Sequence, residues 1–123
     1  MKRILIVDDA ATVRMYHRSV LEEAGYSVAE AINGVEALEK ALLEPFDLYV
    51  VDVNMPKLDG YGFLRQLRTE NMAQAPAIMV STEDATHDQT AAFRAGANAY
   101  IAKPVKPEQL LTHVRLLLGE ASR

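Results

Sequence analysis

Three aspartates are placed where the sequence could assemble a site for phosphoryl chemistry. Asp8 and Asp9 directly follow the apolar run 4–7, and Asp52 directly follows the apolar run 48–51. If both runs are neighbouring parallel strands, about 4.8 Å apart, the three carboxylates meet at one edge of the sheet. One such aspartate alone is ordinarily a helix N-cap, but three packed carboxylates repel one another unless a cation lies among them. All-oxygen ligands with no His or Cys nearby favour Mg²⁺, or a similar hard cation such as Mn²⁺.

Two other predicted strand ends add a hydroxyl group and an ammonium group. Ser81 follows the apolar run 77–80, and Lys103, which precedes Pro104, follows residues 98–101. Taken alone, the serine is a turn residue and the lysine a solvated surface charge. Together with the aspartates they form a set suited to phosphoryl transfer: a carboxylate nucleophile, a metal site, a hydroxyl donor and a fixed cation for the phosphoryl oxygens.

Five short apolar blocks separated by helical patterns predict the fold that positions these residues. Blocks 4–7, 48–51 and 77–80 are continuously apolar, as expected of central strands covered by helices on both faces. Blocks 27–31 and 98–101 are more mixed, which is typical of edge strands. The sequence therefore predicts an α/β protein with the flavodoxin-like (βα)5 fold, a doubly wound parallel sheet in the strand order 2-1-3-4-5.

The helical patterns predict an apolar face for each helix. Asn33 can cap the second helix, Pro107 suits the first position of the last one, and Gly25 and Gly96 are expected to end the first and fourth. The fourth helix, roughly residues 84–95, is rich in alanine and is the least firmly anchored. The predicted inward residues are Val13, Tyr16, Val20, Leu21 and Ala24 in the first helix, Val35, Leu38 and Leu42 in the second, Phe63, Leu64 and Leu67 in the third, and Leu110, Leu111, Val114, Leu117 and Leu118 in the last.

Composition limits the class of protein. With 123 residues, half of them hydrophobic, the chain is expected to form a single domain over residues 1–123. It has no Cys, which excludes a disulfide scaffold and a cysteine nucleophile. Its net charge of -4, with no basic run longer than Lys2-Arg3, makes a nucleic-acid partner unexpected. The first apolar run is too short for a signal peptide or membrane span, so we expect a cytoplasmic protein with no membrane partner.

The three histidines do not form a metal-binding pattern. His17 lies beside the inward face of the first helix, whereas His87 and His113 fall on polar faces. We expect them to have packing or surface roles.

In these motifs the chain resembles the receiver domain of bacterial two-component response regulators, most closely the stand-alone chemotaxis (CheY-like) type. The resemblance covers essentially residues 1–120. It rests on the acidic pair in ILIVDD, on Asp52 in VVDVNMPKLDGYGFL, on Ser81 in IMVSTED and on Lys103 in NAYIAKPVKP. The strand order 2-1-3-4-5 is itself a known property of the chemotaxis members of this family.

The resemblance implies a role for each site residue. Asp52 would accept a phosphoryl group from a histidine kinase or a phosphotransfer protein. Asp9, Asp52 and the backbone carbonyl of Asn54 would bind Mg²⁺, and Asp8 would act mostly through water.

Ser81 and Lys103 would hold phosphoryl oxygens, and the bond between Lys103 and Pro104 is expected to be cis. The domain is expected to be a monomer without an output domain of its own, and therefore to signal through a partner protein.

The resemblance also implies a conformational switch. Ser81 would move toward the phosphoryl group and Tyr100 would fill the space it leaves, changing a partner-binding face made by the fourth helix, the fifth strand and the last helix. Asn54 and Glu83 match a pair that bears on hydrolysis rate in chemotaxis members. Thr82 departs from the family, where Ala or Gly is common, so we expect these three residues to tune the lifetime of the phosphoryl group.

Two other functions use a similar architecture. A phosphohydrolase of the haloacid-dehalogenase type would also start from Asp52, but it needs a second Asp two residues later as general acid, and Asn54 cannot transfer a proton. A flavodoxin-like flavin module needs a hydroxyl-rich phosphate loop after the first strand, where Asp8 and Asp9 would repel phosphate. We therefore expect a switch that catalyses only its own phosphorylation and dephosphorylation and is not a turnover enzyme. Whether it serves chemotaxis or another phosphorelay stays open.

Overall fold

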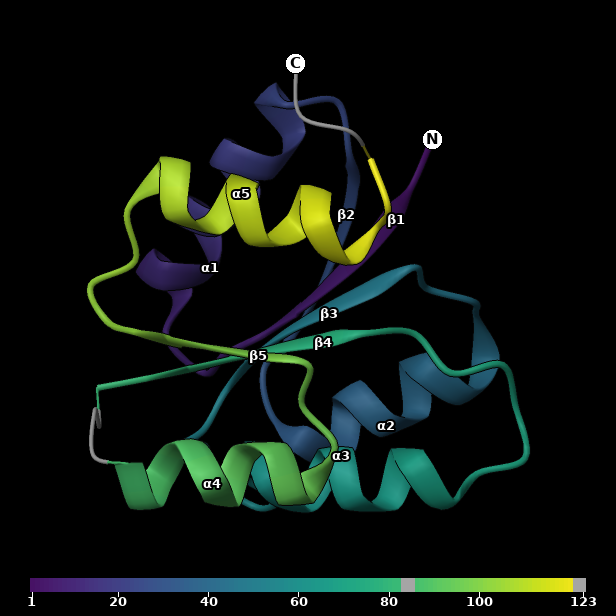
Figure 1. Cartoon of the computed structure of the whole chain (residues 1–123). Helices are drawn as coiled ribbons and strands as arrows, with labels where there is room; N and C mark the ends of the chain where they lie inside the picture. The colour runs from purple at the N-terminus through teal and green to yellow at the C-terminus, as the bar shows by residue number, and fades with distance from the viewer. Residues whose placement is uncertain (83–85, 121–123) are drawn as a thin grey trace.

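Strands and helices alternate along the whole chain. The computed structural model describes residues 1–82 and 86–120. The view in Figure 1 shows the sheet between two layers of helices. In chain order the elements are β1 (Arg3–Val7), α1 (Ala11–Glu23), β2 (Ser27–Ala31), α2 (Gly34–Leu43), β3 (Leu48–Asp52), α3 (Gly60–Thr69), β4 (Ala77–Ser81), α4 (Thr86–Ala95), β5 (Ala99–Ala102) and α5 (Pro107–Leu117).

The sheet is parallel and has the strand order β2-β1-β3-β4-β5, which confirms the predicted order. Ile4 of β1 lies opposite both Val28 of β2 and Leu48 of β3, so β1 is paired on both sides. Strands β2 and β5 form the edges. After β1 the chain turns first to β2 on one side and then to β3 on the other, so the strand order reverses between β1 and β3. Residues that follow these two strands meet at that point.

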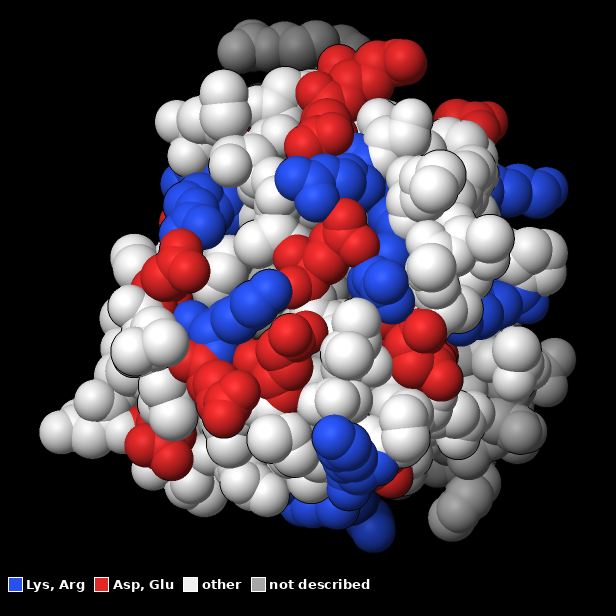
Figure 2. Space-filling view, turned by 180° about the vertical axis from the view of Figure 1, so that it is seen from behind, with Lys and Arg blue, Asp and Glu red and all other residues white. Residues whose placement is uncertain are grey.

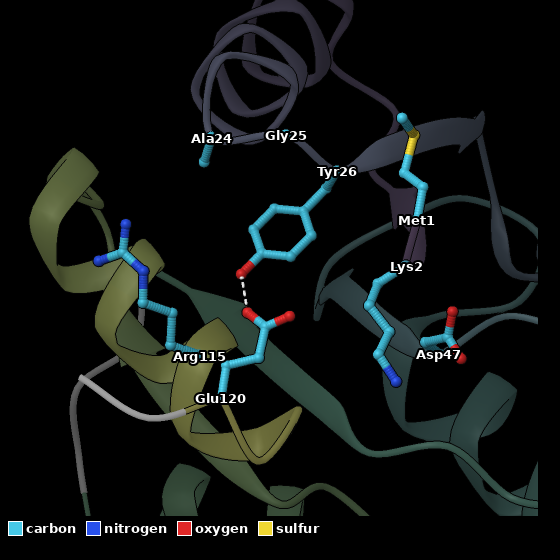
Figure 3. Close-up of a pocket in the computed structure, with 8 residues that line it drawn as sticks. All are labelled: Met1, Lys2, Ala24, Gly25, Tyr26, Asp47, Arg115 and Glu120. Carbon is cyan, nitrogen blue, oxygen red and sulfur yellow. Dashed lines mark hydrogen bonds between the residues drawn. The ribbon is translucent and has the colours of Figure 1, made fainter. Parts of the chain in front are cut away.

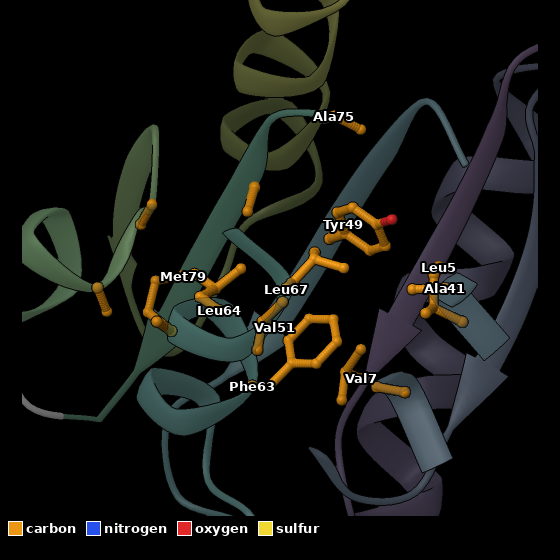
Figure 4. Packing of buried hydrophobic residues seen from close by; sticks show 14 of the residues in the cluster. Leu5, Val7, Ala41, Tyr49, Val51, Phe63, Leu64, Leu67, Ala75 and Met79 are labelled. Carbon is orange, nitrogen blue, oxygen red and sulfur yellow. The ribbon is translucent and has the colours of Figure 1, made fainter. Parts of the chain in front are cut away.

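Two hydrophobic layers hold the helices against the sheet. Helices α1 and α5 cover one face, and α2, α3 and α4 cover the other (Figure 1). Successive strand residues point to opposite faces, so Ile4 and Ile6 pack in the first layer while Leu5 and Val7 pack in the second. Figure 4 shows the second layer. In it, the ring centres of Phe63 on α3 and Tyr49 on β3 lie 5.8 Å apart, and the two rings are nearly edge-on.

The predicted inward faces of α3 and α5 are confirmed. Phe63, Leu64 and Leu67 of α3 are fully buried, and Leu110 and Val114 of α5 are buried as well. The other three predicted residues of the last helix pack against the same core while partly exposed.

The inward face of α1 is rotated slightly from the predicted one: Leu21 and Val20 pack in the core as predicted, whereas Tyr16 and Ala24 do not. Tyr16 and Ala24 are exposed, and His17 is buried together with Leu21. Tyr16 sits at the rim, where its hydroxyl reaches the Val105 carbonyl at 3.4 Å. An apolar pattern cannot detect this rotation, because it scores the tyrosine as apolar and the histidine as polar.

The predicted inward face of α2 is wrong at two of its three residues, and only Leu38 packs against the core. Val35 and Leu42 are exposed, whereas Ala37 and Ala41 are buried and Leu38 is only partly buried. Helix α2 lies against both the sheet and α3, so small residues at the contact let the backbones approach closely. The size of the side chains therefore decides which face of this helix points inward.

Capping residues begin helices α2 and α3 just beyond the carboxyl ends of β2 and β3. The side chain of Asn33 accepts a hydrogen bond from the Glu36 N–H, which confirms the predicted cap. Asp59 caps α3 in the same way through the Gly62 N–H. A Cβ at Gly60 would lie 2.4 Å from the Asp52 carbonyl oxygen, so a glycine is needed where α3 begins under the end of β3.

Within the described ranges, none of the helices combines the length and the apolar composition needed to cross a bilayer.

Candidate functional site

The three predicted aspartates meet at the carboxyl edge of the sheet. One carboxylate oxygen from each of Asp8, Asp9 and Asp52 lies within 4.8 Å of the other two. Asp8 is 3 % exposed and Asp52 is 6 % exposed, whereas Asp9 is open to solvent. The group can hold a metal ion, with Asp9 on the solvent side.

Asp8 is fixed by hydrogen bonds at each of its backbone and side-chain polar atoms. Its N–H donates to the Ala31 carbonyl of β2 at 3.1 Å. Its Oδ1 accepts from the Ala10 N–H at 2.9 Å, and its Oδ2 lies 3.4 Å from Lys103 Nζ. Its carbonyl oxygen accepts from Arg14 Nη1 at 2.8 Å. Asp8 is thus a fixed part of the frame around Asp9 and Asp52.

Lys103 pairs with two members of the acid cluster, Asp8 and Asp52. Its Nζ lies 3.1 Å from Asp52 Oδ1, and its backbone N–H donates to the Ser81 carbonyl at 2.7 Å. The bond to Pro104 is cis, which confirms that prediction. Burial lowers the pKa of Lys103, but the neighbouring carboxylates of Asp8 and Asp52 raise it more, and the net shift is upward. The ammonium group therefore stays charged.

The carboxylates of the acid cluster repel one another. The pKa of Asp52 is raised, first because the carboxyl group is buried and second because Asp8 carries the same charge nearby. Lys103 opposes this shift without cancelling it. An additional cation would relieve the repulsion, and three carboxylates are a donor set that suits a hard divalent ion.

The other predicted site residues lie at or next to neighbouring strand ends. Ser81 is fully buried at the end of β4, and Tyr100 lies partly buried on the edge strand β5. Asn54 and Thr82 are exposed just beyond β3 and β4. Glu83 lies outside the described residues.

Two residues that sequence reasoning did not assign to the site lie close to it. Arg14 contacts the Asp8 carbonyl, although an arginine one turn into an amphipathic helix ordinarily reads as a surface charge. His17 is buried, and within the described part of the chain its Nδ1 has no hydrogen-bond partner. Burial lowers the pKa of His17, while Asp8 raises it and Lys103 lowers it further. Neither residue can be found from spacing alone, because both contacts depend on how α1 is rotated against the sheet.

A largely apolar hollow of about 410 Å³ adjoins the site. Its lining residues come from α1 and from the segments after β4 and β5, and they are Val13, Tyr16, His17, Thr82, Lys103, Pro104 and Val105. Lys103 thus lies between the acid cluster and a concave apolar surface.

A second hollow, of about 600 Å³, lies at the opposite edge of the sheet, beside the residues that precede β1 and β3. Figure 3 shows Tyr26 and Glu120 pointing toward one another there, with the hydroxyl and carboxylate oxygens 2.6 Å apart. Burial, together with the Glu120 carboxylate, raises the pKa of Tyr26 to about 12. This hollow is separated from the aspartates by the length of the strands, so it takes no part in their chemistry.

The face of the molecule turned away from the viewer in Figure 1 carries mixed surface charge. On the face seen in Figure 2, Lys and Arg side chains are interleaved with Asp and Glu side chains. Interleaved charges act over short distances, because neighbours of opposite sign cancel one another's field. The group of three neighbouring carboxylates at the carboxyl edge differs from this face in the sign of its members.

Comparison with known proteins decides the family. The family model of the response regulator receiver domain matches residues 4–115 of the chain. The chain belongs to the response regulator receiver family. Its strand order and helix layers are those of this family's flavodoxin-like fold, as solved neighbours also show.

The relatives of this receiver domain include both regulators and chemotaxis proteins. The transcriptional regulatory protein ResD of Bacillus subtilis is 37 % identical over 121 residues, which are 98 % of this chain and 50 % of ResD. The chain thus spans about half the length of the curated relatives it matches. The chemotaxis protein CheY4 of Vibrio cholerae has a TM-score of 0.90 at 34 % identity, with 95 % of this chain and 98 % of that one covered.

A third neighbour bears on the metal. The receiver domain of the sensor histidine kinase PA1611 from Pseudomonas aeruginosa has a TM-score of 0.90 at 28 % identity, covering 97 % of this chain and 98 % of that one. That structure holds a magnesium ion coordinated in the active-site cleft.

Family membership decides between the functions that the sequence left open. Receiver domains are signalling switches and not turnover enzymes, so the phosphohydrolase and flavin-module hypotheses are set aside. A chemotaxis role is only suggested, because a transcriptional regulatory protein and a chemotaxis protein match this receiver domain about equally well.

Proposed function

We propose that this receiver domain is a phospho-accepting switch in which Asp52 takes a phosphoryl group from a histidine kinase or a phosphotransfer protein, in a reaction that requires Mg²⁺. The observation that carries the proposal is the position of Asp52. Its carboxylate lies within 4.8 Å of two other carboxylates and 3.1 Å from the Lys103 ammonium group. This is a nucleophile held beside one cation, in a cluster that can bind a second.

The transfer replaces one bond to phosphorus with another. A carboxylate oxygen of Asp52 attacks phosphorus, and the bond between phosphorus and the donor imidazole nitrogen breaks. The bond electrons stay on that nitrogen, and the ring leaves as neutral imidazole after taking up a proton. Asp52 becomes an acyl phosphate, which water later hydrolyses to inorganic phosphate and the free carboxylate.

Asp9, Asp52 and the backbone carbonyl of Asn54 would hold the metal, with Asp8 contributing through water. Bound Mg²⁺, or Mn²⁺ in its place, supplies positive charge to the phosphoryl oxygens. The fit rests on the all-oxygen donor set and on the repulsion that raises the pKa of Asp52. The structure of PA1611 with magnesium supports the choice of ion.

Lys103 and Ser81 would hold the transferred group. The Lys103 ammonium is already beside Asp52, and Ser81 ends the neighbouring strand β4. Both side chains can donate hydrogen bonds to oxygens that arrive with the phosphoryl group. Asn54, Thr82 and Glu83 would tune how fast water removes it.

The output would pass through the face made by α4, β5 and α5. Movement of Ser81 toward the phosphoryl group would let Tyr100 change position on β5 and alter the affinity for a target protein. Such a coupling is typically worth about 1 to 3 kcal/mol, or roughly 5- to 150-fold in affinity. The target could belong to chemotaxis, as for CheY4, or to control of transcription, as for ResD.

Labelling by acetyl phosphate tests the acceptor. We expect the wild type to be labelled in Mg²⁺ and not in EDTA, and Asp52→Asn to be unlabelled in both. Asp47→Asn is the matched control, because Asp47 immediately precedes the same strand at its other end. Labelling of Asp52→Asn at the wild-type rate would show that another residue is the acceptor.

Beryllium fluoride, a mimic of the phosphoryl group, tests the output. We expect amide shifts to extend from Asp52 through β5 and α5, and to be reduced in α5 when Tyr100 is replaced by alanine. Shifts confined to the surroundings of Asp52 would contradict the proposed face.

A further inference from the structure

Arg14 connects the acid cluster to the neighbouring edge strand. Its side chain leaves the first turn of α1 and is only 15 % exposed. Nη1 donates to the Asp8 carbonyl oxygen at 2.8 Å, and Nε donates to Glu30 Oε1 at 2.8 Å. One guanidinium group thus joins the loop after β1 to the β2 strand.

Glu30 gives this arginine a firm anchor. Its second oxygen accepts from Arg18 Nη1 at 2.6 Å, and its backbone carbonyl accepts from Lys40 Nζ. Hydrogen bonds from Arg18 and then from Arg14 hold the pKa of Glu30 below its usual value, against the effect of burial. Glu30 is therefore a charged group with a fixed position, and not a flexible surface carboxylate.

The bond to the Asp8 carbonyl constrains the direction of the chain at Asp9. A peptide group is planar, so fixing the carbonyl of Asp8 also fixes the N–H and the Cα position of Asp9. The Ala10 N–H bond to Asp8 Oδ1 closes a ring that also contains this peptide. The Arg14 bond adds a second constraint, which acts directly on the peptide's carbonyl oxygen.

The local helix geometry does not replace this contact. Ala10 occupies the N-cap position of α1 without a side-chain cap hydrogen bond. Asp9 therefore sits in a short turn that is constrained both by the Ala10 N–H and by the Arg14 guanidinium group.

We propose that Arg14 is a positioning residue for the metal site: it holds the peptide between Asp8 and Asp9 so that the exposed Asp9 carboxylate points at the same position as Asp52. The inference rests on the proposed Mg²⁺ site. Arg14 touches neither the metal nor the phosphoryl group, and it acts through the backbone of Asp8.

Losing the charge of Arg14 and losing its hydrogen bond to Asp8 should change the affinity for Mg²⁺ in opposite directions. Removing a cation near three carboxylates makes the site more negative and strengthens the binding of a divalent cation. Removing the hydrogen bond to Asp8 releases Asp9 and weakens binding. The sign of the change in Mg²⁺ affinity therefore separates the two effects.

Isothermal titration with Mg²⁺ measures this sign. We expect Arg14→Gln to raise the Kd for Mg²⁺ about tenfold, in the range found when residues behind metal ligands are replaced. Arg14→Lys keeps the charge but cannot donate to both partners with a rigid fork, so we expect it to raise the Kd by a smaller factor. Arg18→Gln is the matched control: it also removes an arginine from Glu30, but its other contacts are with Glu22 and the Val28 carbonyl. Its Kd should equal that of the wild type or be lower.

Each outcome decides something. Metal-free unfolding curves show which variants are folded, and Arg14→Lys carries the test if Arg14→Gln is not. Folded Arg14 variants that bind Mg²⁺ as tightly as the wild type, or more tightly, would overturn the inference and leave the proposed function intact. A wild-type protein that binds no Mg²⁺ would instead overturn the proposed function on which the inference rests.

Discussion

Charged groups are arranged in opposite ways at the two ends of the parallel strands, their carboxyl ends (the carboxyl edge) and their amino ends (the amino edge). At the carboxyl edge, Asp8 and Asp52 are buried beside each other with one ammonium group between them. At the amino edge, the Arg3 backbone N–H donates to Asp47 at 2.8 Å, and the Arg3 side chain pairs with Glu44 at 2.8 Å. The Arg3 guanidinium also lies 4.7 Å from the centre of the Phe46 ring.

The contacts at the amino edge stabilise the folded protein, whereas the carboxylates at the carboxyl edge repel one another in it. The contacts at the amino edge join opposite charges or a donor and an acceptor, so the fold itself benefits from them. The cluster at the carboxyl edge raises the pKa of Asp52, which means that the ionised carboxylate is disfavoured in the folded protein. The rest of the molecule must stabilise that edge until a cation binds.

The largest expected effect follows loss of the ammonium group that pairs with both buried aspartates at the carboxyl edge. Lys103→Met leaves Asp8 and Asp52 buried without their ammonium partner, and removing one member of a buried pair typically costs about 3 kcal/mol or more. We expect a loss of this size in urea unfolding without divalent ions, and a partial recovery when Mg²⁺ is added. Lys106→Met, at an exposed position three residues later, should change the unfolding free energy by less than about 0.5 kcal/mol. Equal effects of the two substitutions would contradict the buried pairing.

The same substitution at the two ends of β3 should have opposite signs. Asp52→Asn removes a disfavoured charge and should stabilise the metal-free protein, whereas Asp47→Asn weakens a charge-assisted bond to Arg3 and should destabilise it. We expect about 2 kcal/mol between the two variants at neutral pH. A fall in stability for both variants would show that Lys103 compensates Asp52 fully.

The raised pKa of Asp52 also fixes a pH dependence. The unfolded chain loses its Asp52 proton at lower pH than the folded protein, so this group makes metal-free stability fall as pH rises from the ordinary Asp range through the raised pKa. Asp52→Asn should lack that component, and acid titration of the two proteins by circular dichroism would measure the difference.

A smaller effect is expected at the amino edge in alkali. The pKa of Tyr26 is about 12 in the folded protein, above its ordinary value of 10.0, so the contribution of its neutral hydroxyl is present below pH 10 and is lost as pH rises toward 12. Tyr26→Phe should cost about 1 kcal/mol at neutral pH and show a shallower loss of stability in alkali. Parallel alkaline curves for the two proteins would show that the bond to Glu120 contributes little in solution.

The sequence was sufficient to predict the features that depend on chain order. Runs of apolar residues located the strands, and parallel strands bring the residues after them to one edge, so Asp8, Asp52 and Lys103 could be placed together before the structure was known. The rotation of the helices could not be predicted in this way. Apolar periodicity treats Tyr16 as a core residue and His17 as polar, and it favours Val35 over Ala37, although close packing requires the small residue.

The contact of Arg14 could not be predicted for a related reason. It joins a residue on α1 to Glu30 on β2 and to the Asp8 backbone, so it depends on the rotation of a helix and on the register of a strand together. A pattern along one segment contains neither quantity. The residues that support the site are thus harder to find than the residues that form it.

Chemical mapping of the acceptor tests the central claim most directly. The protein is incubated with acetyl phosphate and Mg²⁺ and then treated with borohydride, which reduces an aspartyl phosphate to homoserine, and the digested peptides are read by mass spectrometry. We predict homoserine at position 52 alone, and none when EDTA replaces Mg²⁺ or when Asp52 is replaced by asparagine. Homoserine at position 8 or 9, or conversion of Asp52 that proceeds equally well in EDTA, would contradict the account.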